Sequence, residues 1–313
     1  TLFAQGVRMA NLEFIQYHPT TFALPDKRCL ISEAARGEGG RLFVMREGEK
    51  WYFMEDLYPE LGNLMPRDVV SREMFRAARD PNCENRIWLD MTHLPPQTWE
   101  RKLPDLREEC LRYLHIDPAK QPVPVEPGIH YFMGGIDVDV DHRTNISGLY
   151  AAGECACQYH GANRLGGNSM LGAIYGGRVA ADDILSGPMA EYDAEPEGIG
   201  ILLAEASGNA DRQAFRLRDV LRDSMGIERD AAGLQKGLDA LERMLAENLP
   251  DQENARILLA KAMLLSALSR QESRGAHTRT DYPEKDDVRF KGTTLAVYKQ
   301  GPIEISDRLV AGE

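Results

Sequence analysis

The sequence of 313 residues lacks several features that would point to particular classes of protein. It contains no window of about 18 uninterrupted apolar residues, so we expect no membrane-spanning helix. Basic residues are fewer than acidic ones, 37 against 49, which argues against a nucleic-acid-binding surface and a polybasic membrane anchor. No signal-peptide pattern follows Thr1. Apolar residues make up 43%, and at about 100–200 residues per domain the length predicts two or three domains.

Cysteine is scarce as well, with five residues in the whole chain. An odd number is unsuited to a disulfide framework, and Cys155 and Cys157 form a C-x-C pair that is not a zinc spacing and has no second pair to complete a site. We therefore expect no metal site and a reducing, cytoplasmic environment. The sequence begins in mid-pattern without Met, so we expect a piece of a longer protein.

The composition changes along the chain and predicts an α+β and α/β multidomain protein. A proline-rich run at 121–127 is typical of a domain boundary. The next stretch is rich in glycine, and a later one has apolar residues at helical spacing, which predicts a helical bundle. The expected domains are residues 1–127, 128–187, 188–280 and 281–313.

Candidate binding residues first occur near the start of the chain. His18 and Thr20 lie two residues apart in a strand-like run, so their side chains point to the same side and could donate to one carboxylate. The alternative is a core histidine that the backbone satisfies. Glu33 and Arg36 are three apart in a short predicted helix at 31–36, so they can pair. The alternative there is a surface ion pair of little energetic value.

Two more basic residues occur in unusual settings. Arg67 follows Pro66 at a predicted helix start, where a solvated first-turn arginine is the alternative. His130 lies in an apolar run that ends in Gly134 and Gly135. Paired glycines permit close approach of a ligand or of a second backbone.

The strongest pattern resembles half of a dinucleotide site. A predicted strand at 148–153 ends at Glu154, where a carboxylate can accept from a ribose hydroxyl. A glycine-rich turn then leads to a helix that Asn168 and Ser169 can cap, and a helix N-terminus favours anions. Arg164 lies within the turn and suits a substrate carboxylate.

Taken together, these stretches resemble the flavoprotein subunit of succinate dehydrogenase and fumarate reductase, and its relative L-aspartate oxidase. The matching segments follow the family's order and are EFIQYHPT (13–20), LISEAARGEGG (30–40), PRDVVSR (66–72), HYFMGGI (130–136), GLYAAGE (148–154), HGANRLGGNSML (160–171) and QESRGAHTRTDYP (271–283).

The resemblance implies an FAD-binding domain, a capping domain inserted within it, a helical domain and a C-terminal segment. Residues 1–127 would be the capping domain, and 128–187 the C-terminal part of the FAD-binding domain. Residues 188–280 would be the C-terminal helical bundle, followed by the segment 281–313. The Gly-x-Gly-x-x-Gly turn that would hold the FAD pyrophosphate does not occur in this sequence, so the expected FAD site is incomplete.

The resemblance also implies an activity, the interconversion of fumarate and succinate with hydride transfer between flavin N5 and the substrate. Arg67 would donate or accept the proton, with Glu33 and Arg36 as its relay. Four residues would bind the two carboxylates: His18, Thr20, His130 and Arg164. We expect His18, Arg67, His130 and Arg164 to converge around one pocket sized for a four-carbon diacid. Glu154 would bind the FAD ribose, and the backbone at Asn168, Ser169, Met170 and Leu171 would face the flavin.

Two departures from the family's usual motifs leave the substrate open. Phe132 stands where a threonine is common, and Gly172 stands where an acidic residue is common. L-aspartate oxidase is the second hypothesis, and a non-catalytic fragment without bound FAD is the third. The resemblance further implies electron transport through an iron–sulfur subunit, with membrane association through partners. This sequence has no ferredoxin-like cysteine run, so any cluster would lie on another chain.

Overall fold

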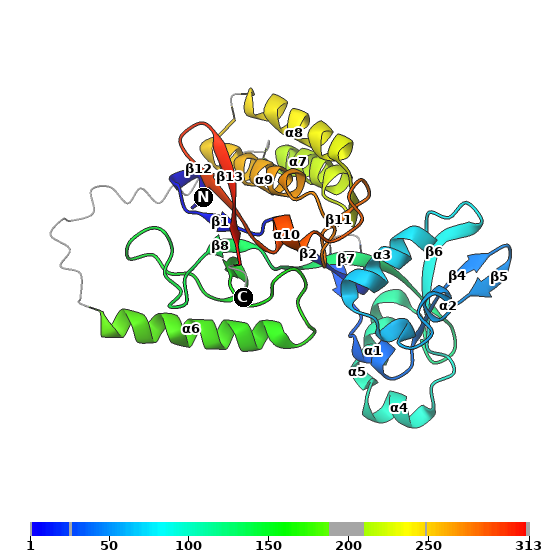
Figure 1. Ribbon diagram of the computed structural model, residues 1–313. Helices are drawn as coiled ribbons and strands as arrows, with labels where there is room; N and C mark the ends of the chain where they lie inside the picture. Colours follow the sequence, from blue (N-terminus) through cyan, green and yellow to red (C-terminus); the bar gives the residue numbers. More distant parts are fainter. Residues whose placement is uncertain (1, 25–26, 188–209, 248, 311–313) are drawn as a thin grey trace. The chain divides into compact units, whose positions relative to one another are not determined.

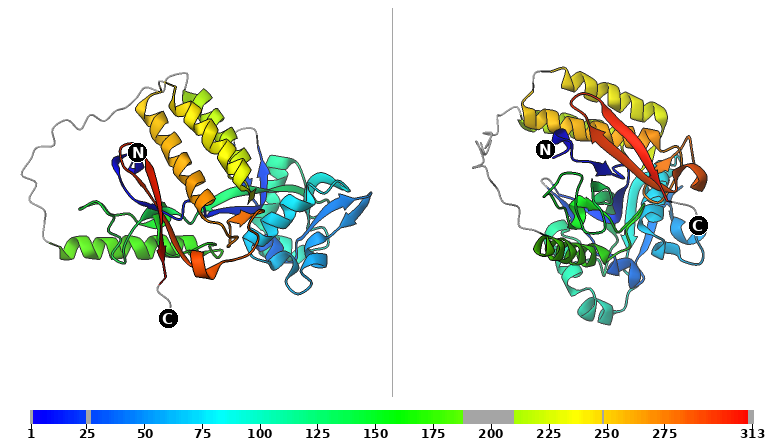
Figure 2. Two further views of the ribbon diagram at one scale, coloured as in Figure 1. Left: turned by 45° about the horizontal axis from the view of Figure 1, so that its top comes forward. Right: turned by 60° about the vertical axis from the view of Figure 1, so that its left-hand side comes forward.

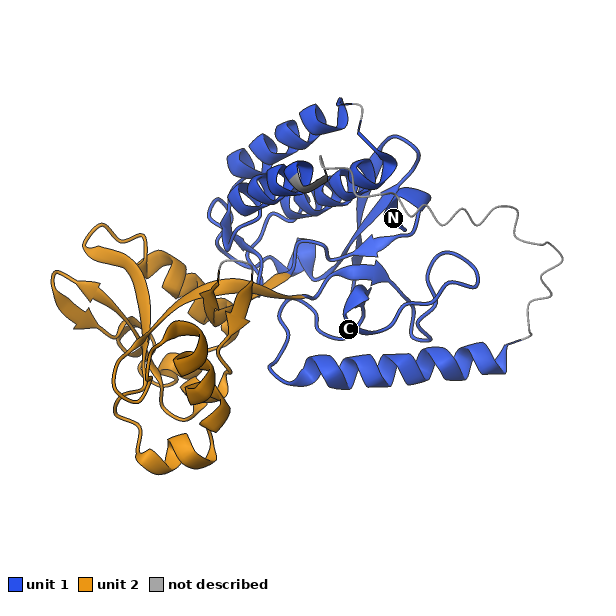
Figure 3. Cartoon of the chain, turned by 180° about the vertical axis from the view of Figure 1, so that it is seen from behind, with its two compact units in different colours: residues 1–14, 132–313 blue, residues 15–131 orange. Residues whose placement is uncertain are grey.

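The computed structural model describes residues 2–24, 27–187, 210–247 and 249–310 (Figure 1). The chain divides into two compact units, which are coloured separately in Figure 3. Unit 1 comprises Thr1–Phe14 and Phe132–Glu313, and unit 2 comprises Ile15–Tyr131. The predicted first domain, 1–127, covers most of unit 2, but its opening residues belong to unit 1. The other predicted boundaries remain predictions.

Unit 2 is built on a six-stranded sheet in the order β3-β2-β7-β6-β4-β5. Its strands are β2 (Ile15–Ala23), β3 (Arg28–Leu30), β4 (Arg41–Arg46), β5 (Glu49–Trp51), β6 (Cys83–Asp90) and β7 (Val123–Phe132). Its helices are α1 (Ala34–Gly37), α2 (Phe53–Leu57), α3 (Arg67–Ala77), α4 (Pro96–Arg101) and α5 (Pro104–Glu109), with shorter turns η2 (Gly62–Leu64) and η3 (Cys110–Leu114).

The helix α3 shows why Arg67 is not a surface residue. Its buried positions include Arg67, Val70, Ser71, Met74 and Ala77, which recur every three or four residues and therefore form one face. That face packs toward the core of unit 2, so the same periodicity that buries Val70 and Met74 also turns Arg67 inward. The helix begins directly after Pro66, as predicted.

Unit 1 contains a five-stranded sheet in the order β13-β12-β1-β8-β9. Its strands are β1 (Met9–Ala10), β8 (Gly135–Asp137), β9 (Ala156–Cys157), β12 (Gly292–Tyr298) and β13 (Ile303–Leu309). A second sheet pairs β10 (Glu228–Arg229) with β11 (Thr278–Arg279). Shorter helical elements are η1 (Phe3–Gln5), η4 (Gly153–Cys155) and α10 (Asp287–Phe290).

Three helices of unit 1 lie together beside the β12–β13 hairpin, as Figures 1 and 2 both show. They are α7 (Ala210–Ser224), α8 (Ala231–Leu245) and α9 (Asp251–Ser269). The periodicity of α8 predicts its buried face, and Leu234, Leu238 and Leu241 are buried there. Residues 188–209 of the predicted helical range lie outside the described residues. No described helix is long and apolar enough to span a membrane.

The paired glycines lie where two neighbouring backbones leave no room for a side chain. A Cβ atom on Gly134 would lie 2.0 Å from the carbonyl oxygen of Asn11, and one on Gly135 would lie 2.4 Å from that of Cys155. Of the two possibilities that the sequence left open, the structure shows close approach of a second backbone.

Three local predictions need correction. Residues 148–153 do not form a strand; Tyr150 makes one isolated bridge with Arg143, because Gly148 and Gly153 adopt positive φ angles of 76° and 79°. The helix predicted at 31–36 is shorter and begins at Ala34. Asn168 opens the helix α6 (Asn168–Ser186) but does not cap it, because Gly167 occupies the cap position with φ 84°.

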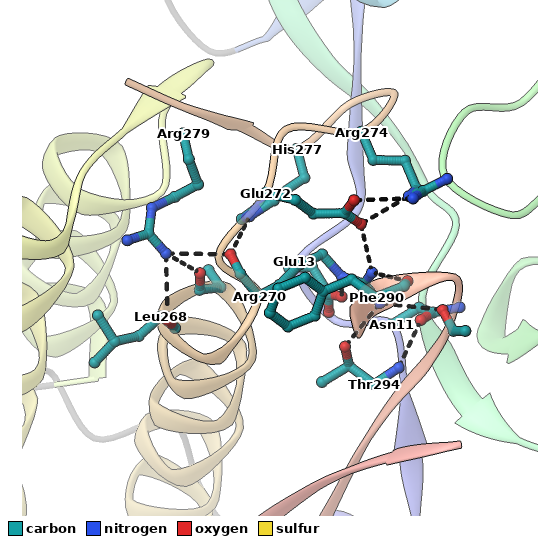
Figure 4. A network of polar contacts seen from close by, with 12 residues as sticks. Asn11, Glu13, Leu268, Arg270, Glu272, Arg274, His277, Arg279, Phe290 and Thr294 are labelled. Atoms are coloured by element: carbon teal, nitrogen blue, oxygen red, sulfur yellow. Dashed lines mark hydrogen bonds and ion pairs between the residues drawn. The ribbon is translucent and has the colours of Figure 1, made fainter. Parts of the chain in front are cut away.

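A buried network of charges ties together distant segments of unit 1 (Figure 4). Its centre is Arg270, whose guanidinium is 1% exposed. The five N–H groups of that guanidinium all find acceptors, namely Glu13 Oε1 at 2.6 Å, Glu272 Oε1 at 2.9 Å, Phe290 O at 2.8 Å, Gly292 O at 3.1 Å and Thr294 Oγ1 at 2.8 Å. We call Glu13, Arg270 and Glu272 the Arg270 cluster. Its one unpaired polar atom among the described residues is Glu13 Oε2.

Candidate functional site

Two histidines predicted to bind substrate lie next to each other in unit 2. His18 is on β2 and His130 on β7, which are neighbours in the sheet. Their ring centroids are 5.1 Å apart with an interplanar angle of 66°, an edge-to-face arrangement. Adjacent strands thus bring together two residues that are far apart in the sequence.

The protonation of His18 follows from its surroundings. Burial, then the charges of Arg67, His130 and Arg36, lowers the pKa of His18 to about 3, so the ring is neutral near pH 7. The backbone N–H of Thr20 donates to His18 Nδ1 at 3.3 Å, which leaves the ring proton on Nε2. His18 Nε2 is buried and has no partner among the described residues. An N–H donor without an acceptor is costly unless a ligand supplies one.

The hydroxyl of Thr20 is engaged within unit 2. It donates to the backbone carbonyl of Ile31 at 3.0 Å, and Thr20 is fully buried. A substrate carboxylate would have to compete with that carbonyl for the hydroxyl proton. The role of Thr20 in substrate binding remains a prediction.

Glu33 joins the two arginines with which the sequence associated it. Arg67 donates to both carboxylate oxygens, from Nε at 3.2 Å and from Nη2 at 2.7 Å, and Arg36 Nη2 donates to Oε1 at 2.8 Å. The side chains of Arg36 and Arg67 are 1% and 9% exposed, so neither is the solvated arginine of the alternative interpretations. We call Glu33, Arg36 and Arg67 the Glu33 cluster.

The electrostatics of the Glu33 cluster favour the ionised form of Glu33. Burial alone would raise the pKa of Glu33, but the hydrogen bond from Arg67 and the charges of Arg67 and Arg36 lower it below its usual value. Burial lowers the pKa of Arg36, the charge of Glu33 opposes that effect, and Arg67 adds to it. The carboxylate is half-exposed and lies between two cations, so it can connect the arginines with solvent.

One residue that contacts this cluster, Gln16, was not singled out from the sequence. Gln16 Oε1 accepts from Arg67 Nη1 at 3.1 Å, and Gln16 is fully buried. Gln16 precedes His18 by two residues on β2, so the alternation that paired His18 with Thr20 also places Gln16 on that side.

The remaining predicted residues belong to unit 1. Arg164 is 4% exposed, and its Nη1 donates to the carbonyl of Leu165 at 3.2 Å. Glu154 accepts from the backbone N–H of Phe132 at 3.0 Å. That Arg164 joins the two histidines and Arg67 at one pocket remains a prediction, because they belong to different units.

The start of α6 has the character expected of part of a flavin site. Met170 and Leu171 are 68% and 67% exposed, and no described side chain caps the helix after Gly167. Exposed apolar side chains beside uncapped backbone N–H groups fit a flat ring that carries negative charge. Asn168 and Ser169 lie in this first turn.

Comparison with known proteins identifies the family that the chain resembles. Residues 2–170 match the family model of the FAD binding domain, and residues 251–312 match that of the fumarate reductase flavoprotein C-terminus. The chain is 37% identical to the succinate dehydrogenase flavoprotein subunit of Bacillus subtilis, over 94% of this chain and 57% of that protein. It is 39% identical to the L-aspartate oxidase of Pyrococcus furiosus, over 90% of this chain and 54% of that protein.

Its fold is similar to that of a solved E. coli quinol fumarate reductase, with a TM-score of 0.77 and 30% identity over 99% of this chain and 61% of that one. The two family models and the mixed α/β fold define the class, a flavoprotein oxidoreductase. The chain belongs to the family of succinate dehydrogenase and fumarate reductase flavoproteins. It spans little more than half the length of the curated relatives described here.

Proposed function

We propose that the protein of which this chain is part interconverts fumarate and succinate, with Arg67 as the proton donor and acceptor. One observation carries the proposal. A buried arginine held by a half-exposed carboxylate lies near a neutral histidine whose remaining donor is unpaired. A dicarboxylate supplies the acceptor that His18 lacks, and a proton-transfer step uses the arginine–glutamate pair.

Substrate binding would fall to the four residues that the family resemblance indicates. His18 Nε2, His130, Thr20 and Arg164 would donate to the two carboxylates, and charge-assisted hydrogen bonds of this kind are the strong ones. Because a substrate held at both ends has little freedom, its reacting carbon would be fixed in position, which lowers the entropic part of the barrier.

Proton transfer would use the Glu33 cluster. Arg67 would give a proton to the substrate carbon and regain one through Glu33, which Arg36 keeps ionised. An isolated arginine is a poor acid, with a pKa above about 12. Arg36 places a second cation beside Glu33, and the carboxylate gives a short route for the returning proton.

Part of the FAD site would be formed by Glu154 at the ribose and by Asn168, Ser169, Met170 and Leu171 beside the ring. When bound, the flavin would supply the hydride for fumarate reduction from its reduced form and accept it from succinate in its oxidised form. The uncapped N-terminal turn of α6 would stabilise negative charge on the ring, in keeping with the exposed apolar side chains around it.

L-aspartate oxidation is the second candidate, and the 39% identity with the P. furiosus enzyme favours it. The same carboxylate donors suit L-aspartate. Steady-state rates with fumarate, succinate and L-aspartate would decide between the two, and preferential oxidation of L-aspartate would refute the first. A third possibility is a non-catalytic chain, which a colourless preparation after incubation with FAD would support.

A partner chain is also part of the proposal. The B. subtilis relative is named a subunit, and electrons from a flavin need an onward acceptor. We expect an iron–sulfur subunit, and membrane association through such partners. Co-purification of an iron-containing chain with the protein expressed in its own cells tests this expectation.

A further inference from the structure

Arg36 makes a second hydrogen bond, besides the one to Glu33, that the proposed function does not use. Arg36 Nη2 donates to Glu33, and Arg36 Nη1 donates to the backbone carbonyl of Asn63 at 2.6 Å. Arg36 Nε is buried and has no partner among the described residues. The direction of this guanidinium therefore depends on two acceptors, of which one is a single carbonyl in the turn η2.

The side chain of Asn63 holds that turn in place. Asn63 Oδ1 accepts from the backbone N–H of Leu42 on β4 at 2.9 Å, and Asn63 Nδ2 donates to Glu55 Oε1 on α2 at 3.3 Å. Arg41 holds Glu55 in turn, from Nε at 2.6 Å. Asn63 is 8% exposed, so water competes little for these bonds.

We infer that Asn63 is a positioning residue for proton transfer, because it fixes the carbonyl that aims Arg36 at Glu33. The role of Asn63 in proton transfer rests on the proposed function. Its effect on the orientation of Arg36 can be tested separately. Without the two side-chain bonds the turn can move and Arg36 loses its second anchor. Glu33 then keeps Arg67 but is less well paired with Arg36.

The charged and titratable groups that face Glu33 are few. They are Arg36 from the end of α1, Arg67 from α3 and His18 from β2, and His18 is neutral. Weaker pairing with Arg36 would therefore raise the pKa of Glu33, by about one unit if the charge moves out of contact. General destabilisation of unit 2 would not move that pKa in the folded chain.

The test is a carbon-13 NMR titration of the chain labelled at its glutamate carboxyls, with the Glu33 signal identified by its loss in Glu33→Gln. We expect Asn63→Ala to raise the pKa of Glu33 by about one unit. Tyr58→Phe is the matched control, because it removes a hydroxyl that donates to Glu73 at 3.1 Å, and it should leave Glu33 unchanged. An unchanged Glu33 pKa in folded Asn63→Ala overturns the inference.

Gly62→Ala is a second variant for the case in which Asn63→Ala does not fold. Gly62 has φ 47°, and an added Cβ would make an ordinary van der Waals contact with Glu55 Cγ at 3.5 Å, so alanine strains the turn without a clash. It should raise the pKa of Glu33 as well. A folded Gly62→Ala variant with an unchanged Glu33 pKa would contradict the inference.

In the holoenzyme, Asn63→Ala should move the acid limb of the pH–rate profile for fumarate reduction to higher pH, because the pKa of Glu33 rises. A wild-type holoenzyme without such activity refutes the proposed function, and the titration still decides the role of Asn63.

Discussion

The two buried arginine clusters differ in how completely their donors are used. In the Arg270 cluster of unit 1 all five guanidinium N–H groups have acceptors, one of which joins α9 to the start of the chain. In the Glu33 cluster of unit 2, Arg36 Nε and the neighbouring His18 Nε2 have none among the described residues. The guanidinium of Arg270, with all its donors used, serves the fold, whereas the unmet donors of Arg36 and His18 suit the ligand site proposed above.

The largest effect on stability should come from a change to the Arg270 cluster. Arg270→Met leaves Glu13 and Glu272 buried without their shared cation, and breaking a buried pair in this way costs about 3–5 kcal/mol. Urea unfolding followed by circular dichroism measures this loss in the free energy of unfolding. Arg222→Met, which removes an exposed arginine, is the control and should cost less than about 1 kcal/mol. Equal losses of unfolding free energy in Arg270→Met and Arg222→Met would show that the Arg270 cluster does not stabilise the fold.

A change to the Glu33 cluster should affect the reaction more than the stability. Arg67→Gln keeps a polar side chain but removes the proposed proton donor, so we expect kcat for fumarate reduction to fall by about 100-fold or more. The free energy of unfolding should change less than in Arg270→Met. Activity within a few-fold of wild type would remove Arg67 from the proposed mechanism.

The pH dependence of stability should report the neutral state of His18. Its pKa is about 3 in the folded chain and 6.5 as its ordinary value, so between these values the unfolded chain binds the extra proton. Stability from this group is complete above pH 6.5 and is lost as the pH falls toward 3, by about 1–2 kcal/mol at pH 5.

His18→Asn should remove that part of the acid sensitivity, whereas His93→Asn, at an exposed histidine, should retain it. Unfolding curves at pH 7 and pH 5 for the three chains would show this. Identical acid sensitivity in wild type and His18→Asn would mean that His18 is charged.

The smallest effect concerns Thr20. Because its hydroxyl donates to the Ile31 carbonyl, Thr20→Val should cost about 1 kcal/mol of stability. It should raise the KM for fumarate less than His18→Asn does. A KM increase as large as that of His18→Asn would show that the hydroxyl turns to the substrate after all.

The sequence was informative where a contact follows from regular spacing. Glu33 and Arg36 are neighbours along one short segment, and the periodicity of α3 turns Arg67 toward them. The pairing of β2 with β7 could not be read from the sequence, although the motifs pointed to both histidines.

Prediction failed where backbone geometry decides. The expected strand at 148–153 begins and ends at glycines with left-handed φ, and a sequence does not show which sign φ takes. Asn63 lies in a turn without periodicity, so nothing in its surroundings marked it. Its contacts to β4 and α2 exist only once those elements have assembled.

The neutral imidazole of His18 has a consequence for turnover in the proposed reaction. Fumarate and succinate carry the same two charges and differ by two hydrogens, so a pocket lined only by cations would retain the product as firmly as it captured the substrate. A donor without charge orients a carboxylate but adds little to its retention. Rapid departure of the product, in either direction, would then depend on one basic side chain that stays uncharged.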